Sequence, residues 1–173
     1  YTHIFDAPGV STKAVIPLVT LYGSYFISET VRIVAFDATA IHPQYYSDFG
    51  LYLHSQSIKA LDNRLFVNLL LGAHALLFQV RGIHYLRPTA PQGVEVVLKD
   101  AFKRAHSLSA GSFIYPTISG RSYNNLWIRW GSSRFFGELN YIAWREKIGE
   151  LDDQPVYSRS VGFSIGFPVA SFL

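Results

Sequence analysis

The last forty residues alternate between apolar and polar positions with a period of two. In the final run, one side holds large apolar residues and the other small or polar ones: Val161, Phe163, Ile165, Phe167 and Val169 against Ser158, Ser160, Gly162, Ser164 and Gly166. The preceding run sets Phe135, Leu139, Tyr141 and Ala143 against Arg134, Glu138, Asn140 and Glu146. Successive residues of a strand face opposite sides. Both runs therefore predict strands, joined by the charged loop 147–155.

Similar alternation predicts strands earlier in the chain, over Lys13–Gly23, Glu29–Ile41, Ser47–Lys59 and Asn125–Gly131. Pro17 lies inside the first of these strands. Because proline cannot donate a hydrogen bond to a strand ladder, we expect a bulge or an unpaired position there.

Four stretches are less regular. Leu65–Phe78 is almost continuously apolar, and periodicity alone allows a buried helix; a strand is favoured because its flanks look like hairpins. Val94–Tyr115 is long enough for one tilted strand or for two. Leu86–Gly93 contains two prolines and predicts a loop, and residues 1–11 predict an extended lead-in. The whole chain, 1–173, is expected to be a single all-β domain of about eight strands, with a range of eight to ten.

Composition fits an envelope protein, and it also fits a soluble β-barrel with a large ligand cavity. The chain has 173 residues, of which 49% are hydrophobic, 16% aromatic and only 16% charged, whereas about 25% of a soluble domain is charged. Low charge with many aromatic residues is typical of a surface that meets lipid headgroups. The net charge of +3 is spread without a dense basic run, so nucleic-acid binding is not predicted.

Cysteine is absent, which excludes thiolate metal sites, cysteine nucleophiles and disulfides. No two histidines have a ligand-like spacing with a carboxylate, so no metal site is predicted, and no cofactor is expected. No uncharged apolar run reaches the length of about 20 residues that a membrane-spanning helix needs.

Three features favour a closed barrel in a membrane. Isolated charges lie on faces opposite to apolar ones, small residues fill the polar face of the final strand, and the short connection 131–133 is followed by the long one 147–155. A closed barrel is stable in lipid because every backbone polar group pairs with a neighbouring strand. We therefore predict a closed antiparallel up-and-down transmembrane β-barrel, with apolar side chains outside and a filled polar interior.

With this pattern, the chain resembles bacterial outer-membrane β-barrels of the eight-stranded type. Its final strand, Tyr157–Leu173, is similar to the aromatic-alternating strand by which such proteins are delivered to the barrel-assembly machinery. The resemblance implies a place in the bacterial outer membrane after removal of a signal peptide. It also implies membrane lipids and the assembly machinery as partners, and a structural, binding or narrow-pore role.

Two sets of residues are predicted to serve such a barrel. An interior charge network would contain Glu95, Lys99, Lys103, Arg129, Arg134 and Glu138, because buried charges must pair. Aromatic residues at headgroup level would include Trp127, Trp130, Trp144 and Tyr141.

Two alternatives remain. Outer-membrane phospholipases and lipid A deacylases are similar around His54, where a strand would carry a histidine base and a serine nucleophile on one face. Here Ser55 and Ser57 alternate onto the opposite face, so a β-bulge would be needed to bring them together. Enzyme activity is therefore only an alternative expectation. The second alternative is a soluble lipocalin-like barrel that carries an apolar ligand.

Overall fold

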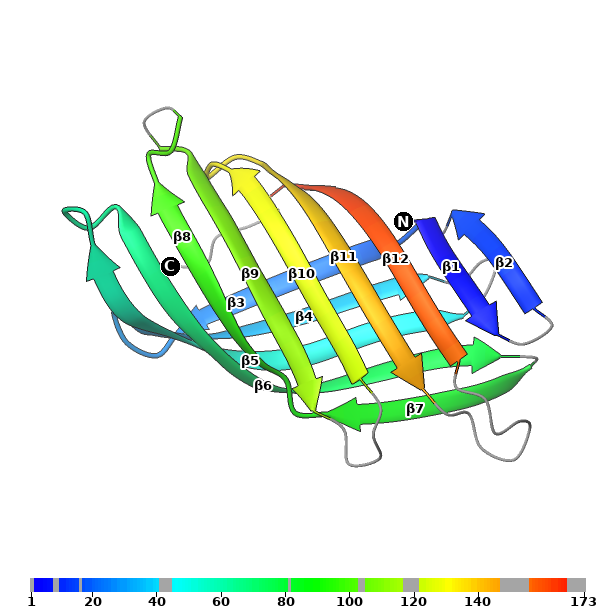
Figure 1. The fold of residues 1–173 in the computed structure, drawn as a ribbon. Helices are drawn as coiled ribbons and strands as arrows, with labels where there is room; N and C mark the ends of the chain where they lie inside the picture. Colours follow the sequence, from blue (N-terminus) through cyan, green and yellow to red (C-terminus); the bar gives the residue numbers. More distant parts are fainter. Residues whose placement is uncertain are drawn as a thin grey trace.

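The computed structural model describes residues 2–7, 10–15, 17–40, 45–80, 82–102, 105–116, 122–146 and 156–167. These residues form one antiparallel sheet of twelve strand segments, which curls strongly into an open half-barrel (Figure 1). The segments are β1 (Thr2–Ala7), β2 (Val10–Val15), β3 (Val19–Phe26), β4 (Val31–Ala40), β5 (Tyr46–Ala60), β6 (Leu65–Val80), β7 (Ile83–Thr89), β8 (Gln92–Lys99), β9 (Ser107–Pro116), β10 (Ser122–Gly131), β11 (Phe136–Glu146) and β12 (Val156–Gly166). The described residues contain no helix long and apolar enough to cross a membrane.

Most neighbours in the sheet are also neighbours in the sequence. The order is β2-β1-β12-β11-β10-β9-β8-β6-β5-β4-β3, and β7 pairs with β6. Short hairpins explain this order, because a tight turn places the next strand beside the last. The two ends of the sheet are β2 and β3, which follow each other in the chain.

Several expectations for individual strands are confirmed. Leu65–Phe78 is a strand, as the first part of β6. Val94–Tyr115 belongs to two strands, β8 and β9, and the turn between them contains Asp100 and Ala105 with φ of 50° and 67°. Pro17 separates β2 from β3, so the expected interruption takes the form of a break between two segments.

The prediction of a loop over Leu86–Gly93 is wrong for most of that range. Only Ala90 and Pro91 interrupt the strand segments there, and β7 and β8 pair with two halves of β6 in one continuous register. They therefore act as one bent strand. Pro88 is tolerated because β7 pairs only with β6 among the described residues, so the far edge of β7 needs no donor.

The expected lead-in also contains paired strands. β1 pairs with both β12 and β2. If β7 with β8 and β2 with β3 are each counted as one interrupted strand, the sheet has ten strands, at the upper end of the expected range. The sheet is open in that its two edge strands, β2 and β3, are not paired with each other among the described residues.

The two faces of the sheet differ sharply. Large apolar side chains on the outer face are exposed, among them Leu51, Leu69, Leu71, Val94, Val96, Ile114, Leu126, Ile128, Leu139, Tyr141, Val161, Phe163 and Ile165. Phe163 is 66% exposed, whereas Glu95 and Glu138 on the inner face are 5% and 6% exposed. The inner face also holds an apolar cluster of Tyr52, Leu70, Leu76, Phe78, Phe113 and Trp127.

Candidate functional site

Five aromatic rings of the inner wall each lie over a glycine directly opposite on the neighbouring strand. The pairs are Phe36–Gly50, Tyr52–Gly72, Phe113–Gly93, Trp127–Gly111 and Phe136–Gly166. A Cβ added to any of these glycines would lie within 3.0 Å of the ring. Each glycine therefore provides the space into which a ring folds flat against the wall.

Four of these rings form a continuous layer along the inner wall, which we call the aromatic layer: Phe36, Tyr52, Phe113 and Trp127. Their successive centroids are 5.2, 4.6 and 5.1 Å apart. Such distances suit offset aromatic contacts. Since Tyr52, Phe113 and Trp127 also belong to the buried apolar cluster, the layer is part of the packed inner face of the sheet.

An ion pair joins two strands beside this layer. Arg129 and Glu138 lie directly opposite on β10 and β11, and Arg129 donates from Nε and Nη2 to Glu138 Oε2 over 2.8 and 2.5 Å. The guanidinium also lies over the rings of Phe136 and Tyr22, 4.7 and 5.5 Å from their centroids. The pair is thus held by both charge and aromatic contact.

A second polar group, which we call the polar bridge, consists of Arg32, His54, Glu95 and Asn68. Arg32 Nη2 lies 3.2 Å from His54 Nδ1, and that nitrogen lies 3.9 Å from Glu95 Oε2. The amide of Asn68 donates to the same carboxylate oxygen over 2.8 Å. The bridge therefore connects β4, β5, β6 and β8 across the concave side of the sheet.

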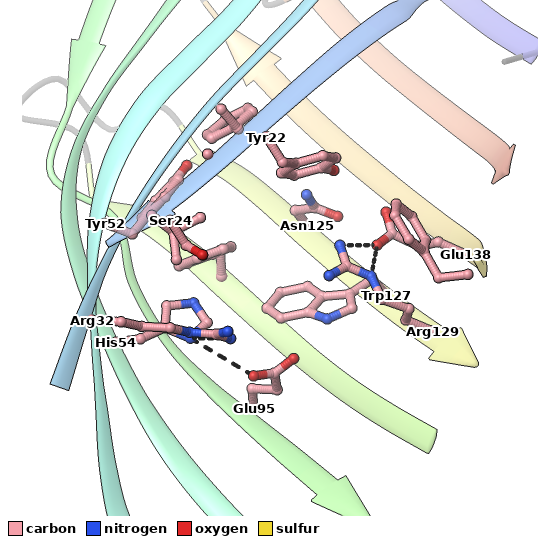
Figure 2. A pocket seen from close by; sticks show the side chains of 15 residues that line it. Tyr22, Ser24, Arg32, Tyr52, His54, Glu95, Asn125, Trp127, Arg129 and Glu138 are labelled. Atoms are coloured by element: carbon pink, nitrogen blue, oxygen red, sulfur yellow. Dashed lines mark hydrogen bonds and ion pairs between the residues drawn. The ribbon is translucent and has the colours of Figure 1, made fainter. Parts of the chain in front are cut away.

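A cavity of about 250 Å³, the central cavity, lies among these groups (Figure 2). The aromatic layer, the polar bridge residues Arg32, His54 and Glu95, and the Arg129–Glu138 pair all line it. A second cavity, of about 260 Å³, shares Arg32 and His54 with the first and extends to Glu29 and Lys99. The side chains of Arg32 and His54 thus stand between the two cavities.

Another buried polar group lies near the opposite ends of β5 and β6. The imidazole of His74 contacts Asp48 Oδ1 through Nε2, and its Nδ1 is 2.9 Å from Thr89 Oγ1. The hydroxyl of Tyr46 donates to Asp48 Oδ2 over 3.3 Å. These contacts satisfy a carboxylate that would otherwise be costly to bury.

The charged residues expected to form one network are divided. Glu95, Arg129 and Glu138 line the central cavity, in two separate groups. Lys99 lines the second cavity, where its Nζ lies 4.3 Å from the centroid of the Phe66 ring. Arg134 is exposed in the turn between β10 and β11. Lys103 lies outside the described residues.

The aromatic residues expected at headgroup level are also divided. Trp127 is buried in the aromatic layer on the inner wall, so it does not lie on the outer face. Trp130 and Tyr141 are on the outer face, 38% and 37% exposed. The side chain of Trp144 is outside the described part of the chain.

The residues of the hydrolase alternative are not assembled. His54 faces the interior beside Arg32, whereas Ser55 lies on the opposite face. A β-bulge does occur between Gln56 and Ile58, but the hydroxyl of Ser57 donates to the carbonyl of Ser55 over 3.3 Å. Within the described residues, no group of three or more His, Asp or Glu is placed to hold a metal ion.

Sequence reasoning missed several residues of the site, namely Tyr22, Arg32, Phe36, Tyr52, Asn68, Phe113 and Asn125. Arg32 carried a usable signal, because a lone charge alternates there with apolar residues of a strand. The aromatic–glycine pairs carried none, since recognising them requires the strand register. Comparisons of the chain with protein families, curated proteins and solved structures find no match.

Proposed function

We propose that this chain is a membrane-spanning β-barrel of the bacterial outer membrane, with a blocked interior and a structural or binding role. One observation carries the proposal: the apolar residues are outside and the charged residues inside. In water, the exposed side chains of Leu51, Phe163 and Ile165 would remain unburied, and exposed apolar patches of this extent are rare on soluble monomers. Lipid tails would cover them.

The strand pairing supports closure into a ring. β1 lies between β12 and β2, and β2 continues into β3 after a break of only three residues. If β2 and β3 act as one strand, the ring runs from β12 through β1 and β2–β3 to β4. It then contains ten strands that alternate in direction, and bacterial single-chain barrels have even numbers of antiparallel strands.

The filled interior favours binding or a structural role over free conduction. The aromatic layer and the buried apolar cluster cover much of the inner wall, and the side chains of Arg32 and His54 stand between the two cavities. On the outer face, the exposed side chains Val161, Phe163 and Ile165 of β12 suit contact with two kinds of partner, lipids and the barrel-assembly machinery.

The soluble alternative requires the reverse distribution of side chains, and the lipid-hydrolase alternative requires a serine beside His54. Among the described residues, the exposed apolar outer face and the separation of His54 from Ser55 and Ser57 favour the membrane barrel over both alternatives. We therefore carry neither of them forward as a second candidate function.

The experiment is refolding into detergent micelles and into phospholipid vesicles, followed by gel electrophoresis of heated and unheated samples. A membrane barrel should need detergent or lipid to stay folded, should resist extraction from vesicles by carbonate, and should migrate differently before and after heating. A chain that is folded, monomeric and soluble without detergent would contradict the proposal.

A further inference from the structure

We infer that the central cavity binds a small aromatic monocarboxylate, through Arg32 and His54. This inference deepens the binding role proposed above by naming the chemical class of the ligand. It rests on three features of the cavity wall among the described residues: a guanidinium that forms no ion pair with a carboxylate, an amide oxygen without a hydrogen-bond partner, and a lining rich in aromatic rings.

The guanidinium belongs to Arg32. Arg32 and Arg129 both line the cavity, and both are partly buried. Among the described residues, only Arg129 of these two forms an ion pair, with Glu138. Within the described part of the chain, Arg32 forms no ion pair with a carboxylate. Its side chain hydrogen-bonds to His54 Nδ1. Guanidinium groups pair preferentially with carboxylates through two parallel hydrogen bonds. Arg32 can therefore bind the carboxylate of a ligand.

His54 adds a second donor beside it. Because Nδ1 accepts the hydrogen bond from Arg32, a neutral imidazole must carry its proton on Nε2. This assignment follows from the hydrogen-bond partner. Both His54 and Arg32 line the central cavity (Figure 2), so a bound carboxylate can receive hydrogen bonds from two residues.

The amide belongs to Asn125. Its Oδ1 is buried and has no hydrogen-bond partner in the part of the chain that the structure describes, although the residue lines the same cavity. Buried polar atoms are nearly always satisfied in native proteins. Asn125 therefore provides a place for a second polar group of the ligand, such as a hydroxyl.

The shape and charge of the cavity restrict the ligand further. Five of its lining residues are aromatic beyond Tyr22, namely Phe36, Tyr52, Phe113, Trp127 and Phe136, and ligand sites commonly combine apolar walls with a few polar groups. The positive charges of the two arginines are balanced by the negative charges of Glu95 and Glu138, which also line the cavity. One added negative charge is compatible with this balance, whereas several would be repelled by the two carboxylates.

The test uses the fluorescence of Trp127, which lines the cavity. Replacing the other two tryptophans, with Trp130→Phe and Trp144→Phe, leaves Trp127 as the sole reporter. The refolded protein is titrated with benzoate and 4-hydroxybenzoate, and then with the neutral 4-hydroxybenzyl alcohol and the cationic tyramine. We expect a saturable change with the two carboxylates, tighter binding of 4-hydroxybenzoate, and at least about tenfold weaker binding of the neutral and cationic analogues.

Variants assign the binding to the named residues. Arg32→Met should weaken 4-hydroxybenzoate binding by at least about tenfold, and Arg32→Lys should recover part of the loss. Asn125→Ala should remove the advantage of 4-hydroxybenzoate over benzoate. Arg134→Met, which removes an arginine from an exposed turn, is the control and should leave binding unchanged.

The inference is overturned if millimolar carboxylate produces no saturable change, if the neutral analogue binds equally well, or if Arg32→Met binds like the parent protein. Heat-dependent gel mobility is measured first on every variant, so that loss of folding is not mistaken for loss of binding. Saturable, Arg32-dependent binding by a protein that is folded without detergent would refute the membrane proposal and leave this inference standing.

Discussion

The glycines beneath the aromatic rings are the residues at which the smallest substitution should have a large effect. At Gly111, a Cβ would collide with the ring of Trp127, and the ring cannot move away without disturbing Phe113, which stacks against it. We expect Gly111→Ala to lower the free energy of unfolding by roughly 1–3 kcal/mol, as overpacking of a filled core does.

Urea unfolding in detergent micelles measures this effect. Gly137→Ala is the matched control, because a Cβ at Gly137 would have nothing within 4 Å. The control should be neutral or slightly stabilising, since alanine restricts the unfolded chain. Equal stability of the two variants would mean that the rings do not rest on the glycines.

A second residue-scale prediction concerns the unequal burial of the Arg129–Glu138 pair. The side chain of Glu138 is 7% exposed and that of Arg129 is 34% exposed. Arg129→Gln leaves a buried carboxylate without its cation and should cost about 3 kcal/mol. Glu138→Gln leaves a guanidinium that reaches water, so it should cost less.

The same unfolding measurement on both single variants and the double variant completes a double-mutant cycle. The double variant should be more stable than Arg129→Gln alone, because no unpaired charge remains. A larger loss for Glu138→Gln than for Arg129→Gln would contradict the burial that the structure assigns to the pair.

At this scale, the sequence could predict faces but not contacts. The period of two places Glu95, Arg129 and Glu138 opposite the apolar residues of their strands, and they do line the interior. It could not predict that they form two groups, because partners depend on the register between strands. The bulge at Ser57 illustrates this, since one extra residue changes every later pairing of β5.

Single strands carry the clearest difference between a membrane barrel and a soluble sheet. Leu126 lies in the middle of β10 on the outer face and is 50% exposed. In a bilayer, Leu126→Lys should cost roughly 2–4 kcal/mol, the range for lysine near the midplane of a barrel. On a water-exposed surface, the same change should alter the free energy of unfolding by no more than about 0.5 kcal/mol.

Folding equilibria in phospholipid vesicles distinguish the two outcomes. Ser133→Lys is the control, because Ser133 is exposed in the turn between β10 and β11. It should be tolerated in either environment. A tolerated lysine at Leu126 in vesicles would place the outer face in water and remove the main support for the membrane proposal.

Strands with a clear alternation were predictable, and those with prolines were not. β5, β10, β11 and β12 follow their hydrophobic pattern closely. β7 was missed because two prolines and a glycine near its end indicate a loop. The sheet tolerates them because proline needs no donor at an unpaired edge, and edge position is a property of the assembled sheet.

The pairing of β1 with β12, on which the proposed ring depends, can be tested by a disulfide, because the chain has no cysteine of its own. Ile4 of β1 lies directly opposite Arg159 of β12, and opposed residues of antiparallel strands have suitable Cα separations for a disulfide. Ile4→Cys with Arg159→Cys should form a disulfide and stabilise the protein by roughly 4 kcal/mol, since it closes a very long loop.

The crosslink is detected as a mobility change on non-reducing gels after heating. Ile4→Cys with Val161→Cys is out of register by two residues and should react more slowly. Equal yields from both pairs would indicate that β1 is not held against β12, and the proposed ten-strand ring would then lack its connecting strand.

For the whole molecule, the all-β class followed from periodicity, and a filled interior was expected, but the aromatic lining of the inner wall was not. A charged, small-residue face predicts a polar interior, whereas the structure places large rings over the small residues. Gly166, expected to be small because a narrow interior has little room, is one of the sites that a ring covers. Predicting this would have required the pairings of all strands at once, which no local pattern contains.

The blocked interior makes a prediction for ion flow. Tyr52, Phe113 and Trp127 pack against one another on the inner wall. If the proposed closed barrel is narrowed by these rings, the parent protein should give no steady conductance in planar bilayers. Replacing all three by alanine removes most of this packing and should produce discrete conductance steps, because water can then enter along the polar wall. Phe113→Ala alone removes the central ring and should give smaller or rarer steps.

Heat-dependent mobility selects variants that still fold, so that current through misassembled protein is not counted. Leu126→Ala, on the outer face of β10, is the control and should remain silent, because it leaves the rings in place. Steady conductance of the parent protein, equal to that of the triple variant, would mean that ions pass around the aromatic layer. The layer would then support the wall without closing the lumen, and a narrow-pore role would be favoured over a binding one.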